Sequence, residues 1–160
     1  EREHIRKAVA IHTEITGSRP LGIYQGKPSP NTRRLIVEEG GFVYDADSYA
    51  DELPYWVKVN DKDHLIVPYT LDANDMRFVT ASGFAHGDQF YVYLKDAFDC
   101  LYEEGKTSPR MMSIGLHGRL VGRPGRIQGL ERFMAHLKTH PDVWICKRID
   151  IANHWRTHHS

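Results

Sequence analysis

One histidine, His117, stands where an apolar run stops and a segment rich in glycine and arginine begins. The run from Met111 to Leu116 predicts a buried strand, and three glycines, three arginines and a proline occupy the nine residues after His117, 118–126. Functional groups in α/β proteins gather where strands end, because the strand holds the group while the loop leaves space for a ligand. A histidine there could transfer a proton near neutral pH. It could equally cap a backbone carbonyl, and the local pattern leaves both roles open.

A second group of candidate residues lies in an acidic loop that follows the short apolar run 42–44. Its members are Asp45, Asp47, Asp51, Glu52, Tyr55 and Trp56. Carboxylates at strand ends can orient a histidine or hold a metal, and aromatic side chains can wall a small-molecule pocket. The spacing does not match a calcium-binding loop, which needs a glycine at its sixth position and a glutamate at its twelfth. A solvated, Asp-rich turn is the alternative, but it gives no reason for the Pro-Tyr-Trp sequence, so we favour a site.

His136 and His140 are four residues apart, a spacing that places both on one face of a helix and could serve a metal ion. They fall in the last turn before Pro141, where positive charge is favourable near the helix dipole. No third ligand follows at a recognisable distance, so we expect a structural role. The histidines of the C-terminal tail, residues 154–159, are treated in the same way because terminal segments often fray.

The remaining candidates carry weaker patterns. Arg119, Arg123 and Arg126 could bind an anion before a helix, but the lysine followed by Ser or Thr of a phosphate loop is absent. Structural contacts of these arginines are an equal possibility. Cys100 and Cys146 have no neighbouring base in the sequence, and neither opens a helix, so neither is expected to be a nucleophile.

Short apolar segments alternate with one-sided helical patterns along the whole chain. We expect helices over residues 1–16, 31–39, 88–104, 125–139 and 149–155, and strands over 19–24, 42–44, 65–69, 111–116 and 143–146. The segment 70–84 is expected to be long and irregular. This alternation predicts an α/β fold built from βα units with a parallel sheet, either a barrel or a doubly wound sheet. With no repeat and no obvious linker, residues 1–160 are expected to form a single domain.

The composition excludes several classes of protein. The chain has 160 residues, of which 41% are hydrophobic and 26% are charged, ordinary values for a soluble domain. Lysine plus arginine and aspartate plus glutamate balance at 21 each, so bulk charge does not favour nucleic acid or a membrane surface. No apolar stretch reaches membrane-spanning length, and two cysteines without close spacing suit a reducing compartment. A cytoplasmic protein is expected. Because the sequence opens on a charged helical pattern without methionine, we expect it to be an excerpt of a longer chain.

Seven segments together carry a family resemblance: TGSRP (16–20), GIYQG (22–26), SPNTRR (29–34), GFVYDAD (41–47), DELPYW (51–56), VPYTLDANDMRF (67–78) and MSIGLHGRLVGRPGR (112–126). They resemble the PuuE-type allantoinase branch of the polysaccharide deacetylase (NodB-homology) family. The resemblance covers nearly the whole chain and corresponds to the C-terminal half of these enzymes. It implies a portion of a distorted (β/α)7 barrel that hydrolyses non-peptide C–N bonds. For this branch it implies opening of the allantoin ring to allantoate, in purine breakdown.

The resemblance also implies roles for individual residues. Arg19 corresponds to an arginine that braces the catalytic acid, and His117 corresponds to the general acid that protonates the leaving nitrogen. The residues implied to line or support the substrate pocket are Asp45, Asp47, Asp51, Tyr55, Trp56, Leu116 and Arg119. Deacetylases usually place Asp after this histidine, whereas Gly118 follows it here. That departure fits the allantoinase branch and argues against a polysaccharide substrate.

The paired acids of the family's first motif and the His-x-x-x-His of its second motif are expected to lie upstream of Glu1, so this chain is expected to carry only half of a site. We therefore expect the isolated chain to be inactive, and we expect the complete enzyme to need no metal and to act on a small cyclic ureide. The resemblance also implies a homo-oligomer, a tetramer, with neither nucleic acid nor membrane as partner. The alternatives are an N-deacetylase of chitin- or peptidoglycan-type sugars, with zinc or another divalent metal held by upstream residues, and a non-catalytic fragment.

Overall fold

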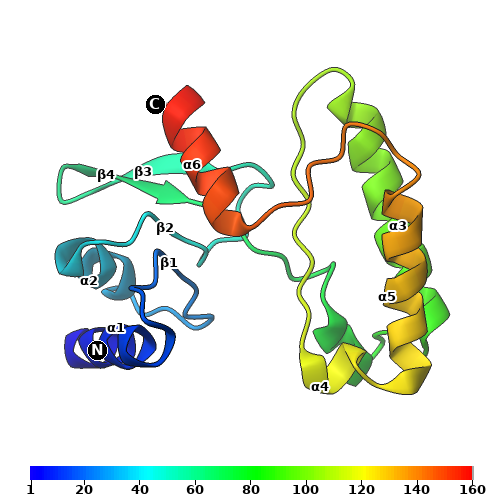
Figure 1. The fold of residues 1–160 in the computed structure, drawn as a ribbon, viewed down its shortest axis with the longest axis horizontal. Helices are drawn as coiled ribbons and strands as arrows, with labels where there is room; N and C mark the ends of the chain where they lie inside the picture. The colour runs from blue at the N-terminus through cyan, green and yellow to red at the C-terminus, as the bar shows by residue number, and fades with distance from the viewer. Residues whose placement is uncertain (160) are drawn as a thin grey trace. The chain divides into compact units, whose positions relative to one another are not determined.

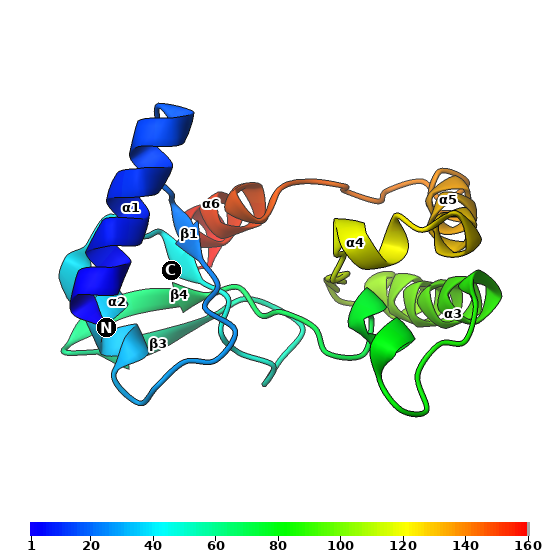
Figure 2. The ribbon, with the colours of Figure 1, turned by 90° about the horizontal axis from the view of Figure 1, so that it is seen from below.

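A computed structural model describes residues 1–159, which fall into two compact units. Unit 1 comprises Glu1–Pro68 together with the C-terminal segment that begins at Cys146, and unit 2 comprises Tyr69–Ile145. Figures 1 and 2 show unit 1 in blue, cyan and red and unit 2 mainly in green, yellow and orange. Each unit is described by itself below. The expectation of a single domain remains a prediction.

Unit 1 is a small mixed sheet with three helices (Figure 1). Its elements are α1 (Arg2–Thr16), β1 (Gly22–Ile23), α2 (Thr32–Glu39), β2 (Tyr44–Asp45), β3 (Tyr55–Val59), β4 (Lys62–Ile66) and α6 (Arg148–His158). The strand order is β1-β2-β4-β3, in which β1, β2 and β4 run parallel and β3 is antiparallel to β4. The parallel register pairs Gly22 with Tyr44 and Tyr44 with Leu65. The carboxyl ends of the parallel strands therefore meet at one edge, where Asp45 ends β2.

The hairpin between β3 and β4 places the aromatic residues of the acidic loop in a strand. Its turn consists of Asn60 and Asp61, which both have positive φ, at 49° and 60°. Two consecutive positive φ angles suit the tight turn that joins twisted antiparallel strands, and Asn and Asp tolerate them better than most residues. Tyr55 and Trp56, expected in a loop, therefore begin β3 instead.

Helices and the C-terminal segment cover the sheet of unit 1. Ile5 of α1 packs with Leu35 and Ile36 of α2, and these residues form one core cluster. Helix α6 is tied to the end of β4, because the Arg148 guanidinium donates hydrogen bonds to the carbonyls of Val67 and Pro68. The amphipathic patterns of helices α1 and α2 were thus read correctly.

Unit 2 is helical, with α3 and α5 side by side in both views (Figures 1 and 2). Its elements are the 3-10 helix η1 (Asp75–Val79), α3 (Gly87–Gly105), α4 (Gly118–Val121) and α5 (Pro124–Leu137). The core lies between the helices and consists of Ala73, Phe84, Phe90, Leu94, Phe98, Val121, Phe133 and Leu137. Near one end the two long helices touch through glycines, since a Cβ on Gly129 would lie 2.3 Å from the carbonyl oxygen of Gly87.

Two expected strands did not form. Residues 111–116 are extended, but their only bridge pairs Gly115 with Asn74 in parallel, and the chain turns into η1 directly after Asn74. Residues 143–146 have no strand partner among residues 1–159, and Trp144 and Ile145 are exposed. An apolar run becomes a strand only when another backbone segment satisfies its N–H and C=O groups. The α/β class itself is confirmed. Within residues 1–159 no helix is both long and apolar enough to cross a bilayer.

Candidate functional site

His117 and Asp75 form a hydrogen-bonded pair in unit 2. The His117 Nδ1–H donates to Asp75 Oδ1 over 2.6 Å. The second carboxylate oxygen, Oδ2, accepts the backbone N–H groups of His117 at 2.7 Å and Val121 at 3.1 Å. The Asp75 side chain is 0% exposed, whereas the His117 side chain is 31% exposed. A buried carboxylate thus holds one edge of a ring whose other edge is open to a reactant.

Local sequence explains how Asp75 reaches this position. The Asn74 side chain caps η1 by accepting the N–H of Met76 at 2.9 Å, so Asp75 becomes the first residue of that helix. The Asp75 N–H then donates to the carbonyl of Gly115 at 3.0 Å. This approach needs a glycine, because a Cβ at position 115 would lie 2.2 Å from the Asn74 side chain. The bridge between the two segments therefore sets the distance between Asp75 and His117.

The pairing decides which atom of His117 is available for chemistry. A neutral imidazole has one N–H and one lone pair, and a carboxylate can only accept, so Nδ1 carries a proton. Nε2 is then the atom that can accept or donate a proton to a reactant. A carboxylate that fixes the tautomer and balances the charge of the ring is the arrangement used for general acid–base histidines. The geometry favours proton transfer over the alternative of a simple carbonyl cap.

Leu116 and Arg119 flank this histidine and are both exposed. Arg119 lies in the four-residue helix α4, and His117 is the N-cap residue of that helix. Among the described residues, no hydrogen bond or ion pair of Arg119 is found, which leaves its guanidinium available for an anionic or carbonyl group. Substrate contact by either residue remains a prediction.

The acidic loop lies in unit 1, and its first aspartate is buried in an ionic cluster. Asp45 accepts hydrogen bonds from Arg33 Nε at 2.9 Å, from His64 Nε2 at 3.0 Å and from the backbone N–H of Asp47 at 3.0 Å. Its side chain is 1% exposed and that of His64 is 6% exposed. Burial raises the pKa of the Asp45 carboxyl, but the hydrogen bonds from His64 and Arg33 outweigh burial and leave the pKa below its ordinary value. Asp45 is therefore a structural anion.

The other acids of this loop hold its backbone. Asp47 accepts the N–H groups of Gln25 at 2.8 Å and Gly26 at 2.7 Å, and so ties the loop after β2 to the loop after β1. Asp51 accepts the N–H groups of Glu52 and Leu53. Each of these carboxylates accepts two backbone N–H groups, and their substrate-binding roles stay predictions.

The two aromatic residues also have protein partners in unit 1. The Tyr55 hydroxyl lies 2.6 Å from the hydroxyl of Ser48, and the Trp56 indole N–H donates to the carbonyl of His159 at 2.7 Å. Arg156 lies over the Trp56 ring. These contacts order the loop and the end of α6, and the substrate-binding roles of Tyr55 and Trp56 stay predictions.

Arg19, the second predicted catalytic residue, is also in unit 1. Its guanidinium forms an ion pair with Glu39 and donates to the carbonyl of Gly40, and it lies 5.4 Å from the Phe42 ring centroid. The structure thus joins Arg19 to the C-terminal end of α2. The Arg19 Nε–H is buried and unpaired among residues 1–159, so the side chain retains a donor for a further acceptor.

Sequence reasoning missed Asp75, the partner of His117. The residue lies 42 positions earlier in the segment expected to be irregular, where no periodic pattern marks an inward-facing side chain. One signal was available: Asn74-Asp75 is a polar pair within the block 67–78 that carries the family resemblance, and Asn is a favourable cap before a helical turn. Spacing along the chain cannot show that this turn lies against the end of the 111–116 segment.

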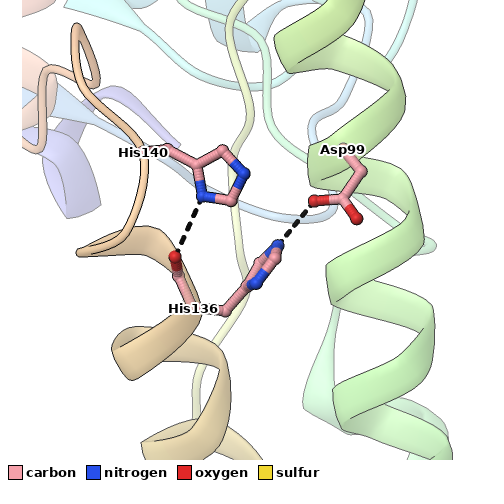
Figure 3. A group of neighbouring side chains, drawn as sticks. All are labelled: Asp99, His136 and His140. Atoms are coloured by element: carbon pink, nitrogen blue, oxygen red, sulfur yellow. Dashed lines mark hydrogen bonds and ion pairs between the residues drawn. The ribbon is translucent and has the colours of Figure 1, made fainter.

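No third ligand follows His136 and His140 in the sequence, but the fold brings one from an earlier helix. Asp99 of α3 lies beside them, and one ligand atom from each of the three residues falls within 4.8 Å of the others (Figure 3). The group uses neither His117 nor Asp75. No other group of three His, Cys, Asp or Glu side chains within residues 1–159 has this proximity. The residues around His117 therefore do not supply a metal-ligand set, and we derive no step through a metal.

Comparison with known proteins gives relatives over nearly the whole chain. A Schizosaccharomyces pombe protein described as “Putative polysaccharide deacetylase” is 44% identical over 176 residues, which cover 99% of this chain and 55% of that protein. A solved structure of a “probable Polysaccharide deacetylase” from Pseudomonas aeruginosa has 58% identity and a TM-score of 0.96, covering 99% of this chain and 54% of its own. A structure of PuuE allantoinase has 57% identity and a TM-score of 0.96, with 99% and 53% coverage.

A more distant structure supports the fold alone. A polysaccharide deacetylase structure from Mycobacterium smegmatis has a TM-score of 0.83 at 22% identity and covers 98% of this chain. No protein-family model matches the chain. The chain spans about half the length of the relatives it matches.

These relatives confirm the resemblance that the motifs indicated, and they confirm an α/β portion of the deacetylase fold. The relationship rests on more than half of the aligned residues being identical in two solved structures, together with the motif blocks around Asp75 and His117. Over nearly its whole length, the chain is therefore similar to about half of a polysaccharide deacetylase, with PuuE allantoinase among its similar solved structures.

Proposed function

We propose that this chain supplies the general acid of an enzyme that hydrolyses a C–N bond in a cyclic ureide, with allantoin as substrate. The observation that carries the proposal is the His117–Asp75 pair, in which the Nδ1 edge is fixed at 2.6 Å by a buried carboxylate and the ring is 31% exposed. Similarity to PuuE allantoinase supports the choice of substrate. The polysaccharide deacetylase relatives support hydrolysis of a C–N bond as the coarser class of reaction.

The reaction requires a proton at the leaving nitrogen. Water adds to a ring carbonyl, and the C–N bond then breaks with its electron pair passing to nitrogen. An amide anion is a poor leaving group, so that nitrogen must be protonated as the bond breaks. His117 Nε2 donates this proton, while Asp75 balances the positive charge that the ring carries beforehand. Ring opening of allantoin by this route gives allantoate.

The chain contributes only part of the catalytic machinery. The attacking water needs a base, and the resemblance places the family motifs that would supply it upstream of Glu1. Arg19, with its unpaired Nε–H, is the candidate to brace that base, as the resemblance implies. Arg119 is the candidate to hold a carbonyl or ureido group of the substrate.

The test is the rate of allantoin ring opening by the intact protein and its His117→Ala variant. We expect kcat/KM to fall by about 100-fold or more, the usual contribution of a general acid. Asp75→Asn should lower kcat by a smaller factor and change the pH profile, because it alters the tautomer and charge balance of the ring rather than removing it. A loss below about tenfold for His117→Ala would exclude the general-acid role.

A matched control separates chemistry from folding. His86 is an exposed histidine of the same unit at the start of α3, and His86→Ala should leave kcat/KM within about twofold of the original value, since surface changes are usually small. If His86→Ala and His117→Ala reduced the rate equally, the effect would lie in stability, and the assignment of His117 would fail.

N-deacetylation of an amino sugar is the second candidate, favoured by the descriptions of two relatives. It would release acetate from an N-acetylglucosamine oligomer and would require a divalent ion held by residues outside this chain. Activity on allantoin that survives exhaustive chelation supports the first proposal. Acetate release that is lost on chelation and restored by zinc supports the second candidate. If the protein shows neither activity, the result supports a non-catalytic role.

Several properties of the whole protein are part of the proposal. By family resemblance we propose a homo-oligomer, a tetramer, acting in the cytoplasm in purine catabolism. The only partner proposed besides its own copies is the small-molecule substrate, and no cofactor is required by the steps given above. Size-exclusion chromatography with light scattering tests the oligomeric state directly.

A further inference from the structure

The group Asp99, His136 and His140 in unit 2 has the composition of a metal site. Asp99 projects from α3, His136 lies in the last turn of α5, and His140 follows just beyond its end (Figure 3). His136 Nε2 lies 2.5 Å from Asp99 Oδ1, and the two imidazole rings have centroids 4.6 Å apart. The three side chains therefore converge on one point between two helices.

His140 is already in the state that a metal ligand requires. Its Nδ1 lies 3.0 Å from the carbonyl oxygen of His136, and a carbonyl can only accept, so Nδ1 carries the ring proton. The lone pair is then on Nε2, which Figure 3 shows on the side of the ring facing Asp99. Metal-ligating histidines usually donate their second ring N–H to a carbonyl or carboxylate, because this fixes the tautomer and the ring orientation.

The surrounding side chains hold the group in place. The His140 ring packs edge-on against Phe98, 5.0 Å between centroids, and against Tyr102, 4.8 Å between centroids. Lys95 Nζ binds the other carboxylate oxygen of Asp99, Oδ2, at 2.6 Å. Oδ1 is thus directed at the histidines by a fixed partner, as outer-shell groups direct ligands in known metal sites.

The chemistry of the donors selects the ion. Two imidazole nitrogens with one carboxylate suit zinc and its neighbours in the first transition row, while magnesium and calcium prefer oxygen ligands only. In the 2.5 Å contact a carboxylate can only accept, so the His136 Nε2–H donates its proton to Asp99. A bound ion would replace this proton and separate the two atoms to about 3.4 Å, given metal–ligand bonds of about 2.1 Å in a tetrahedral arrangement. A fourth position would be open to water.

We propose that Asp99, His136 and His140 bind one Zn²⁺, or a similar divalent transition ion, that joins α3 to the C-terminal end of α5. Such an ion would stabilise the packing of the two helices at the end away from the Gly87–Gly129 contact. At that end the side chains of the helices set the distance between them. The site is separate in its residues from His117 and Asp75, so the inference stands or falls independently of the proposed function.

The experiment is a titration of the metal-free intact protein with Co²⁺, followed by its visible d–d absorption, and with Zn²⁺, followed by calorimetry. We expect a saturable site with one ion per chain that is lost or weakened at least tenfold in His136→Gln, His140→Gln and Asp99→Asn. Saturating Zn²⁺ should raise the Tm of the original protein by about 2–8 °C and should not raise that of the variants.

The chain contains a matched control for histidine spacing. His154 and His158 of α6 are also four residues apart, and their ring centroids are also 4.6 Å apart, but within residues 1–159 they are not part of a three-ligand group. The double substitution His154→Gln and His158→Gln should leave the affinity unchanged. Loss of binding in this control, with binding kept in the Asp99, His136 and His140 variants, would overturn the proposal.

Metal bound at other sites and loss of folding in a variant can both be distinguished from loss of this site. An ion bound elsewhere in the intact protein adds the same signal to every variant, so only the difference between variants and original protein counts. Absence of that difference would show that the three side chains form only a hydrogen-bonded and aromatic contact. Because Asp99→Asn preserves the shape of the side chain, its circular dichroism and Tm without metal show whether a lost signal reflects lost binding or lost folding.

Discussion

Each unit contains a histidine–aspartate pair, and the two pairs differ mainly in burial. In unit 1 the ring of His64 is 6% exposed and bonds Asp45, whose charge Arg33 also neutralises. In unit 2 the ring of His117 is 31% exposed and bonds Asp75, which is otherwise held by backbone N–H groups. The hydrogen-bond lengths, 3.0 Å and 2.6 Å, do not by themselves distinguish a structural pair from a catalytic one.

This difference indicates that the access of a reactant to the histidine ring decides the role of each histidine–aspartate pair. A buried pair with a cation beside it can only hold strands and loops together, because no reactant reaches the ring. A pair with a buried carboxylate and an open ring edge presents one nitrogen to a ligand and keeps it oriented. The pair of Asp99 and His136 lies between these cases, with a ring that is partly exposed and a second histidine beside it.

Breaking the buried pair should have the largest effect on stability. We expect Asp45→Asn to lower the free energy of unfolding by about 3 kcal/mol, because it leaves the Arg33 and His64 side chains without their carboxylate. Urea denaturation measures the change. Asp51→Asn, on the exposed part of the same loop, should change it by less than about 0.5 kcal/mol. Equal effects of the two substitutions would contradict the structural assignment of Asp45.

Breaking the open pair should affect catalysis and leave stability nearly unchanged. The expected 100-fold loss of activity in His117→Ala corresponds to about 2.7 kcal/mol of transition-state stabilisation. The free energy of unfolding should change by less than about 1 kcal/mol, because Asp75 keeps two backbone donors. A loss of stability as large as that of Asp45→Asn would remove the distinction between the two pairs.

Arg19 tests whether unit 1 also contributes to catalysis. Arg19→Met removes the ion pair with Glu39 and the bond to Gly40, and we expect a loss of about 1 kcal/mol in the free energy of unfolding. Arg34→Met, an exposed arginine on α2 that pairs with Glu38, is the control and should cost less. If Arg19 braces the catalytic base, kcat falls by more than tenfold in Arg19→Met alone. Unchanged kcat would limit Arg19 to its structural role.

The smallest expected effect is the dependence of the free energy of unfolding on acid pH, which involves the buried pair of His64 and Asp45. The folded protein holds the pKa of Asp45 below its unfolded value, so its contribution is fully present above that value and is lost as the pH falls through the lower, folded pKa. Urea unfolding is measured at a series of pH values from about 6 to 3. The free energy of unfolding of the original protein should fall more steeply with decreasing pH than that of the Asp45→Asn variant. Parallel slopes for the two proteins would show that Asp45 is not the titrating group.

The sequence predicted the helices and the candidate acid more successfully than their partners. The amphipathic patterns gave α1, α2, α3 and α5 to within a few residues, because burial of one helical face requires a regular spacing. His117 was found from its place at the end of an apolar run. Asp75, His64 and Asp99 were missed, since each lies at least 19 residues from the residue it contacts.

The strands were predicted less well for a related reason. A strand is defined by a neighbouring backbone, and the runs 111–116 and 143–146 show that apolar character alone does not provide one. The acidic loop was predicted as a site because its residue types suit chemistry. In the structure Asp45, Asp47 and Asp51 bind protein groups, a use that the same residue types serve equally well, and their substrate-binding roles stay predictions.

The sequence by itself determined the α/β class, the helical faces, the balance of charge and the position of a histidine where an extended segment ends. These features depend on composition and on residues that are close together in the sequence, so they can be predicted without the tertiary structure. Only the tertiary structure decided which aspartate binds each histidine and which ring remains open to a reactant. Those outcomes depend on contacts between distant segments, such as the approach of Asn74 to Gly115, and on burial, which exists only once the chain has folded.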